Sequence, residues 1–116
     1  MNVLSLFDGC SGGQLALQRA NIHVDNYYAS EIDKYAIKVT QANFPNTIQL
    51  GDVQVFSLTG FTFKENIDIL VGGSPCQGFS FAGKQLNFDD ERSKLFFEFV
   101  RLKDTLKPKY FLLENV

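Results

Sequence analysis

Short apolar segments alternate with helix-forming segments along this chain. Five segments have the length and residue types of β-strands, at 3–7, 25–30, 47–50, 67–71 and 110–113. Helical composition or spacing occurs at 14–20, at 34–43 and through 95–106, and a short helix or turn is expected within 54–66. Strands that alternate with helices in this way predict an α/β fold with a doubly wound parallel sheet.

The helical faces can be read from the spacing of their apolar residues. In the helix at 34–43 and just before it, the apolar positions are Ile32, Tyr35, Ala36 and Val39. In the last helix they are Leu95, Phe96, Phe99, Leu102 and Leu106. Both faces are predicted to pack in the core. Asp33 is placed to cap the earlier helix, and the strand 110–113 is predicted to be buried.

Length and composition indicate one packed domain, 1–116. The chain has 116 residues, 45% of them hydrophobic, and it contains 12 Phe. No apolar run approaches the roughly 20 residues that a membrane span needs. Cys10 and Cys76 fit neither a metal-ligand spacing nor a disulfide framework, so we expect two unpaired thiols, no metal, and a reducing cytoplasmic setting.

The net charge limits what this chain can bind by itself. It is −2 at pH 7, with a pI near 5.3. Strong binding to phosphates needs clustered Lys and Arg. The main nucleic-acid-binding surface is therefore expected to lie outside these residues.

A glycine-containing turn, Asp8 to Gly13, follows the first predicted strand and precedes a helix. Glycines let the backbone approach a ligand closely, and exposed N–H groups at a helix start favour an anionic group. Ser11 stands where the second glycine of a dinucleotide fingerprint would be. The ligand is therefore not named by the pattern, and a purely structural turn is the alternative.

Carboxylates follow the next two predicted strands. Glu31, at the end of the second strand, could accept hydrogen bonds from ribose hydroxyls. The alternative for Glu31 is an ordinary solvated carboxylate. Asp52 follows the third strand, where it could bind a ligand or cap the next turn.

Cys76 comes shortly after the apolar run 67–71, which Gly72 and Gly73 end. In open parallel sheets, chemistry collects at the carboxyl ends of strands, so this thiol is a candidate nucleophile. Glu114 follows the last strand and is predicted to lie near Cys76. The single histidine, His23, precedes the second strand and is expected at the surface.

Two segments with these residues resemble the DNA cytosine-5 methyltransferases. They are Ser74 to Ser80, followed by Gly83-Lys84, and the closing Glu114-Asn115-Val116. The turn from Leu6 to Gly13 resembles the cofactor loop of the same family, and the similarity covers essentially the whole chain. It implies a Rossmann-like methyltransferase fold, S-adenosylmethionine as cofactor, and a flipped-out cytosine of double-stranded DNA as substrate.

The resemblance also implies roles for individual residues. Cys76 would attack C6 of cytosine, and Glu114 would bind N3 and the 4-amino group. The cofactor residues implied are Phe7, Asp8, Gly9, Ser11, Gly12, Glu31, Ile32, Asp52, Pro75 and Leu95. The substrate residues implied are Gln77, Ser80 and Arg92. The segment 81–90 would be a lid that closes over DNA, for which an ordinary long loop is the alternative.

The family continues beyond the position of Val116 with further strands, a Gln-Arg-Arg motif, a target recognition domain and a late helix. The chain is therefore expected to be a truncated or excerpted catalytic domain, incomplete at its C-terminus, or half of a split enzyme whose second polypeptide carries those parts. A non-catalytic cofactor-binding or assembly subunit and a relative acting on tRNA are the alternatives.

Overall fold

Five parallel strands form the central sheet of the computed structural model, which describes residues 1–58, 62–73 and 91–114. They are β1 (Asn2–Leu6), β2 (Asn26–Ser30), β3 (Ile48–Gln49), β4 (Ile69–Gly72) and β5 (Tyr110–Leu113). Their order is β3-β2-β1-β4-β5. The direction of winding reverses between β1 and β4, which confirms the predicted doubly wound sheet.

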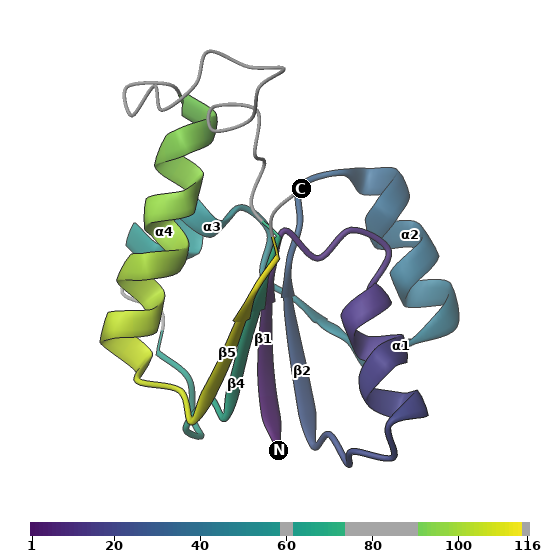
Figure 1. Cartoon of the computed structure of the whole chain (residues 1–116). Helices are drawn as coiled ribbons and strands as arrows, with labels where there is room; N and C mark the ends of the chain where they lie inside the picture. Colours follow the sequence, from purple (N-terminus) through teal and green to yellow (C-terminus); the bar gives the residue numbers. More distant parts are fainter. Residues whose placement is uncertain (59–61, 74–90, 115–116) are drawn as a thin grey trace.

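Helices cover both faces of this sheet, as Figure 1 shows. They are α1 (Gly12–Arg19), α2 (Lys34–Asn43), α3 (Val53–Leu58) and α4 (Glu91–Leu106). α1 and α2 lie on one face, and α3 and α4 lie on the other (Figure 1). Asp33 caps α2 as predicted, because its carboxylate accepts from the N–H groups of Tyr35 and Ala36.

The core has one cluster on each face of the sheet, because neighbouring residues of β1 point to opposite faces. Val3 packs with Tyr27 and Ala29 on the face that α1 covers. The cluster on the α4 face contains Leu4, Leu6, Tyr28, Val53, Ile67, Leu70, Phe99 and Leu102. Phe99 is 1% exposed and Leu102 is 5% exposed, which confirms the predicted apolar face of the last helix.

The predicted core face of α2 is wrong. Ile32 is 74% exposed, Tyr35 is 69% exposed and Val39 is 44% exposed. The buried residue of this helix is Thr40, whose hydroxyl donates to the carbonyl of Gly9 at 3.2 Å. The helix is therefore oriented with Thr40 towards the glycine turn. Its apolar stripe, Ile32, Tyr35 and Val39, faces solvent.

The strand β5 exists where it was predicted, but it is not buried. Tyr110, Phe111 and Leu112 are 54%, 57% and 62% exposed. β5 pairs with β4, and no strand of the described residues lies on its other side. An apolar strand with one unpaired edge is a site where another strand can add.

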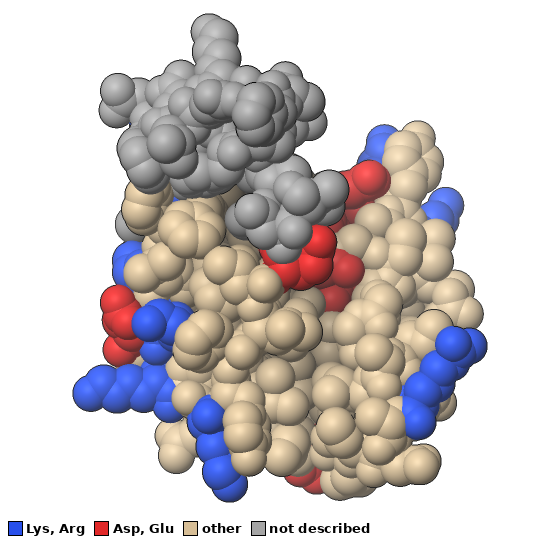
Figure 2. Space-filling model, viewed as in Figure 1, with Lys and Arg blue, Asp and Glu red and all other residues tan. Residues whose placement is uncertain are grey.

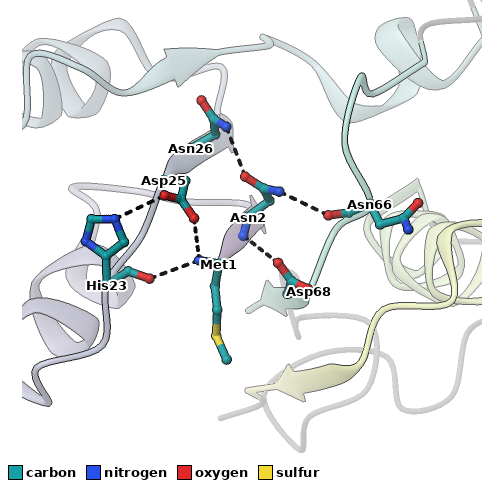
Figure 3. A network of polar contacts seen from close by, with 7 residues as sticks. All are labelled: Met1, Asn2, His23, Asp25, Asn26, Asn66 and Asp68. Carbon is teal, nitrogen blue, oxygen red and sulfur yellow. Dashed lines mark hydrogen bonds and ion pairs between the residues drawn. The ribbon is translucent and has the colours of Figure 1, made fainter.

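Polar side chains join three strands at their amino ends (Figure 3). The backbone N–H of Asn2 donates to Asp68 Oδ2 at 2.7 Å, and its side-chain amide donates to the carbonyl of Asn66 at 3.3 Å. Asn26 Nδ2 donates to Asn2 Oδ1 at 2.9 Å. Asn2 therefore connects the start of β1 to β2 and to the segment that leads into β4.

His23, labelled in Figure 3, lies at the surface, where it was expected. Its side chain is 85% exposed, and Nε2 lies 3.0 Å from Asp25 Oδ1. The amino group of Met1 lies 2.8 Å from Asp25 Oδ2. This ammonium group is the main reason that the pKa of Asp25 lies below its usual value.

Gly72 offers a direct test of the packing between β4 and α4. A Cβ atom at this position would lie 2.6 Å from Cδ2 of Phe99. Because that ring is fully packed, Gly72→Ala should destabilise the fold by about 1–3 kcal/mol, measured by urea denaturation. Gly12→Ala is the control, since a Cβ there meets nothing within 4 Å. Equal stability of the two variants would contradict this packing.

Candidate functional site

The turn after β1 has a left-handed backbone at alternate residues. Phe7, Gly9 and Ser11 have φ values of 55°, 60° and 65°. Such a conformation costs a residue with a side chain roughly 1–2 kcal/mol, so surrounding contacts must hold it. Ser11 is fully buried, and α1 begins directly after it. The predicted cofactor turn is therefore a fixed part of the structure.

The carboxylate of Glu31 joins this turn to the end of β2. Oε1 accepts from the N–H of Gly9 at 2.8 Å, and Oε2 accepts from the N–H groups of Ile32 and Asp33 at 2.9 Å each. Glu31 is thus more than a solvated carboxylate. Oε2 thus accepts two hydrogen bonds and Oε1 accepts one, so Oε1 has a lone pair left for a ligand.

Asp8 lies in the same turn, but its carboxylate is held by protein hydroxyls. Tyr27 donates to Oδ1 at 2.8 Å, and the Ser11 hydroxyl donates to Oδ2. Asp8 is not among the residues that line the cavity described next. Its contacts therefore shape the turn from within the protein.

A cavity of about 310 Å³ opens beside this turn, at the carboxyl ends of β1, β2 and β3. Five of the predicted cofactor residues line it, namely Phe7, Glu31, Ile32, Asp52 and Leu95. They come from four separate segments, and Leu95 reaches the cavity from α4. The volume is within the range of small-molecule sites, and the walls combine apolar side chains with two carboxylates.

Three lining residues were not predicted, namely Ser30, Val53 and Gln54. The signal for Ser30 was its position immediately before Glu31 at a strand end. Its hydroxyl donates to the carbonyl of Gly51 at 2.7 Å, which ties β2 to the turn before α3. Val53 and Gln54 carried no separate signal in the sequence.

Asp52 has the capping role that the sequence left open, and it also lies on the cavity wall. Its Oδ1 accepts from the N–H of Gln54 at 2.8 Å, so it caps the start of α3. The same residue lines the cavity. A cap of this kind fixes the direction of the carboxylate and leaves lone pairs for another donor.

Charge is unevenly distributed around this edge. Figure 2 shows acidic side chains gathered in the upper centre of the face, near the carboxyl ends of the strands that Figure 1 shows. Basic side chains lie at several other places on this face, including the lower left (Figure 2). Two carboxylates, Glu31 and Asp52, line the cavity itself, which favours a cationic or neutral group over a phosphate there.

Glu114 lies at the end of β5, beside the end of β4. Its N–H donates to the carbonyl of Gly72 at 2.8 Å, and its Oε2 would lie 2.9 Å from a Cβ atom on Gly73. The chain reaches Cys76 three residues after Gly73. The register of β4 and β5 thus brings Glu114 next to the segment that leads to the predicted nucleophile.

The remaining predicted site residues lie outside the described part of the chain. These are Pro75, Cys76, Gln77 and Ser80, together with the proposed lid at 81–90. Arg92 belongs to the first turn of α4, and its side chain is likewise outside the described part. Their roles stay predictions.

Two further features concern the described residues alone. No group of three or more His, Cys, Asp and Glu side chains within 1–58, 62–73 and 91–114 is arranged to hold a metal ion. Over the same residues, no helix has both the length and the apolar character to cross a membrane. Cys10 is exposed and forms no disulfide.

A larger hollow, of about 430 Å³, lies on the α1 side of the molecule. It is lined by Gln14, Gln18, Asn21, Ile22, His23, Val24 and Phe44. None of the predicted site residues reaches it. Its size alone does not make it the functional site.

A glycine turn after β1 and a carboxylate after β2, both at the carboxyl edge of a parallel sheet, are typical of doubly wound domains that bind cofactors. Residues 1–116 match the family model for C-5 cytosine-specific DNA methylases. The chain belongs to that family.

Known relatives agree with this assignment. The Type II methyltransferase M1.ScrFI of Lactococcus lactis subsp. cremoris is 46% identical over 116 residues, which cover 98% of this chain and 28% of that protein. The orphan methyltransferase M.SPRI of Bacillus phage SPR is 39% identical over 118 residues, covering 100% of this chain and 26% of the relative.

The fold also matches solved structures. The S. pombe Dnmt2 methyltransferase superposes with a TM-score of 0.73 at 26% identity, covering 100% of this chain and 36% of that one. The Spodoptera frugiperda DNMT2 mutant gives 0.68 at 29% identity, covering 99% and 35%. The chain thus spans less than a third of the two curated relatives and about a third of the solved chains.

Proposed function

We propose that this chain is the cofactor-binding and nucleophile-bearing part of an enzyme that methylates C5 of cytosine in DNA, with S-adenosylmethionine as methyl donor. The observation that carries the proposal is the cavity at the carboxyl edge, which gathers five sequence-predicted cofactor residues from separate segments. The family membership of the whole chain supports the reaction class. The family model is named for DNA methylases, which favours DNA over the tRNA alternative.

The residues present fit S-adenosylmethionine chemically. Glu31 Oε1 would accept a hydrogen bond from a ribose hydroxyl, and Asp52 would accept one from the adenine amino group. Phe7, Ile32 and Leu95 would cover the apolar parts of the ligand. The N–H groups at the start of α1 would receive its carboxylate. Bound there, the cofactor would supply a methyl group that is activated by its bond to a positively charged sulfonium sulfur.

Cytosine C5 is a weak nucleophile until another nucleophile adds to the ring. The Cys76 thiolate would form a bond to C6, which moves an electron pair towards C5 and N3. Glu114 would hydrogen-bond N3 and the 4-amino group, stabilising the charge that develops on the ring. After C5 is methylated and its proton is removed, the returning electron pair expels Cys76 from C6.

Base reading and DNA binding would come from residues beyond these 116. Cytosine in a duplex is stacked, so it must be flipped out before Cys76 can reach it. The chain covers 28% of M1.ScrFI and has a net charge of −2. The remaining part, whether continuous with this chain or carried by a second polypeptide, would pack on the exposed edge of β5.

Glu31→Ala should weaken S-adenosylmethionine binding about tenfold or more, because a charged acceptor for the ribose is lost and Gly9 loses its contact. Isothermal titration calorimetry on the polypeptide that carries residues 1–116 is the measurement. Asp104→Ala, which removes an exposed carboxylate paired with Lys103, is the matched control. Unchanged affinity in Glu31→Ala would remove Glu31 from the site.

An oligonucleotide containing 5-fluorocytosine should become covalently attached to the active enzyme, because fluorine at C5 cannot leave as a proton. Cys76→Ser should abolish the attachment, which denaturing gels and peptide mass mapping detect. Cys10→Ser is the control and should be trapped normally, since Cys10 is assigned no part in the chemistry. An adduct on Cys10, or one that persists in Cys76→Ser, is incompatible with this assignment.

Residues 1–116 by themselves should not methylate DNA, and adding the missing portion in trans or in cis should restore activity. A protein making about 6–10 phosphate contacts depends on Lys and Arg, which this chain does not supply in excess. Transfer of labelled methyl groups to cytosine-containing duplex measures the reaction. Multiple turnovers catalysed by residues 1–116 alone would overturn the expectation.

A further inference from the structure

The glycine turn is held by two side chains that do not line the cavity. Two of its three left-handed residues, Phe7 and Ser11, are not glycine, so the turn is strained. A strained backbone persists only where its surroundings fix it. The side chains that do so from β2 and α2 are Tyr27 and Thr40.

Tyr27 acts on the turn through Asp8. It is 3% exposed, and its hydroxyl donates to Asp8 Oδ1 at 2.8 Å. The second oxygen of Asp8 accepts from the hydroxyl of Ser11, which is fully buried. A Cβ atom on Gly13 would lie 3.3 Å from the Tyr27 hydroxyl, so the first turn of α1 packs against the same group.

Thr40 acts on the turn directly. It is fully buried, and its hydroxyl donates to the carbonyl of Gly9 at 3.2 Å. The N–H of Gly9 donates to Glu31 at 2.8 Å. Both polar groups of Gly9 are therefore fixed, one from α2 and one from the end of β2.

We propose that Tyr27 and Thr40 are positioning residues, which hold the strained turn so that Glu31 and the N–H groups at the start of α1 keep the arrangement that binds the cofactor. Neither residue is among those lining the cavity. The inference rests on the proposed function, which identifies the ligand. The effect of Tyr27 and Thr40 on the turn can nevertheless be measured in the absence of any ligand.

The chemistry of Tyr27 suits this role. Burial, together with the neighbouring charge of Asp8, raises the pKa of Tyr27 well above its ordinary value. The phenol therefore stays protonated and remains a donor throughout the working pH range. Asp8 in turn is held by two hydroxyl donors and does not line the cavity.

Tyr27→Phe removes the hydroxyl and keeps the ring. We expect the amide hydrogens of Gly9 and Ser11, measured by NMR exchange without cofactor, to exchange about three- to tenfold faster. S-adenosylmethionine affinity should fall by a similar factor. Tyr28→Phe is the matched control, because Tyr28 is the next residue of β2 and packs on the opposite face against Phe63.

Thr40 provides a second, independent pair of variants. Thr40→Val keeps the shape and loses the hydroxyl, whereas Thr40→Ser keeps the hydroxyl and loses a methyl group. Faster exchange at Gly9 with weaker binding is expected for Thr40→Val. Thr40→Ser should retain wild-type exchange and affinity, even though losing the methyl group lowers its melting temperature.

The outcomes separate this inference from the function on which it rests. If the wild type binds the cofactor, and Tyr27→Phe and Thr40→Val have the same amide exchange and the same affinity as the wild type, the positioning role alone is overturned. If the loss of affinity is in proportion to the fall in melting temperature in every variant, including Tyr28→Phe and Thr40→Ser, the two residues have a merely structural role. That result also overturns the positioning role. If the wild type does not bind S-adenosylmethionine, the proposed function is contradicted. The role of the two hydroxyls in cofactor binding is then contradicted as well.

Discussion

The conformation of the turn between β1 and α1 is the constraint on which the rest of the site depends. Left-handed backbone at Phe7 and Ser11 is unfavourable in isolation, and the fold supplies contacts that maintain it. The Glu31 carboxylate accepts from the N–H of Gly9 in the turn and from the N–H of Ile32 in the segment that leads to α2. One side chain thus sets both the turn and the wall of the cavity beside it.

This arrangement concentrates negative charge where a cationic cofactor is proposed and leaves little positive charge for DNA. Glu31 and Asp52 line the cavity, and the whole chain has a net charge of −2. These charges fit the proposal that this domain binds the cofactor while other residues bind nucleic acid. The exposed apolar residues of β5 give those other residues a surface on which to pack.

Sequence reasoning located the five strands, α1 and α2 to within two residues of their ends, because glycine, proline and capping residues mark those ends strongly. It placed the start of α4 four residues late. Asp33 and the strand at 110–113 are clear cases. It failed for the face of α2, where an apolar stripe at Ile32, Tyr35 and Val39 is exposed and Thr40 is buried. Periodicity reports which residues share a face, but it does not report which face meets the sheet.

The sequence by itself determined the doubly wound order of elements, the family, and the residues worth examining at strand ends, since all of these depend on local patterns and motif spacing. Only the tertiary structure decided that Phe7, Glu31, Ile32, Asp52 and Leu95 share one cavity. It also decided that Tyr27 and Thr40 hold the turn and that β5 is exposed. These depend on how strands pair and how helices rotate against the sheet, which are contacts between residues far apart in the chain.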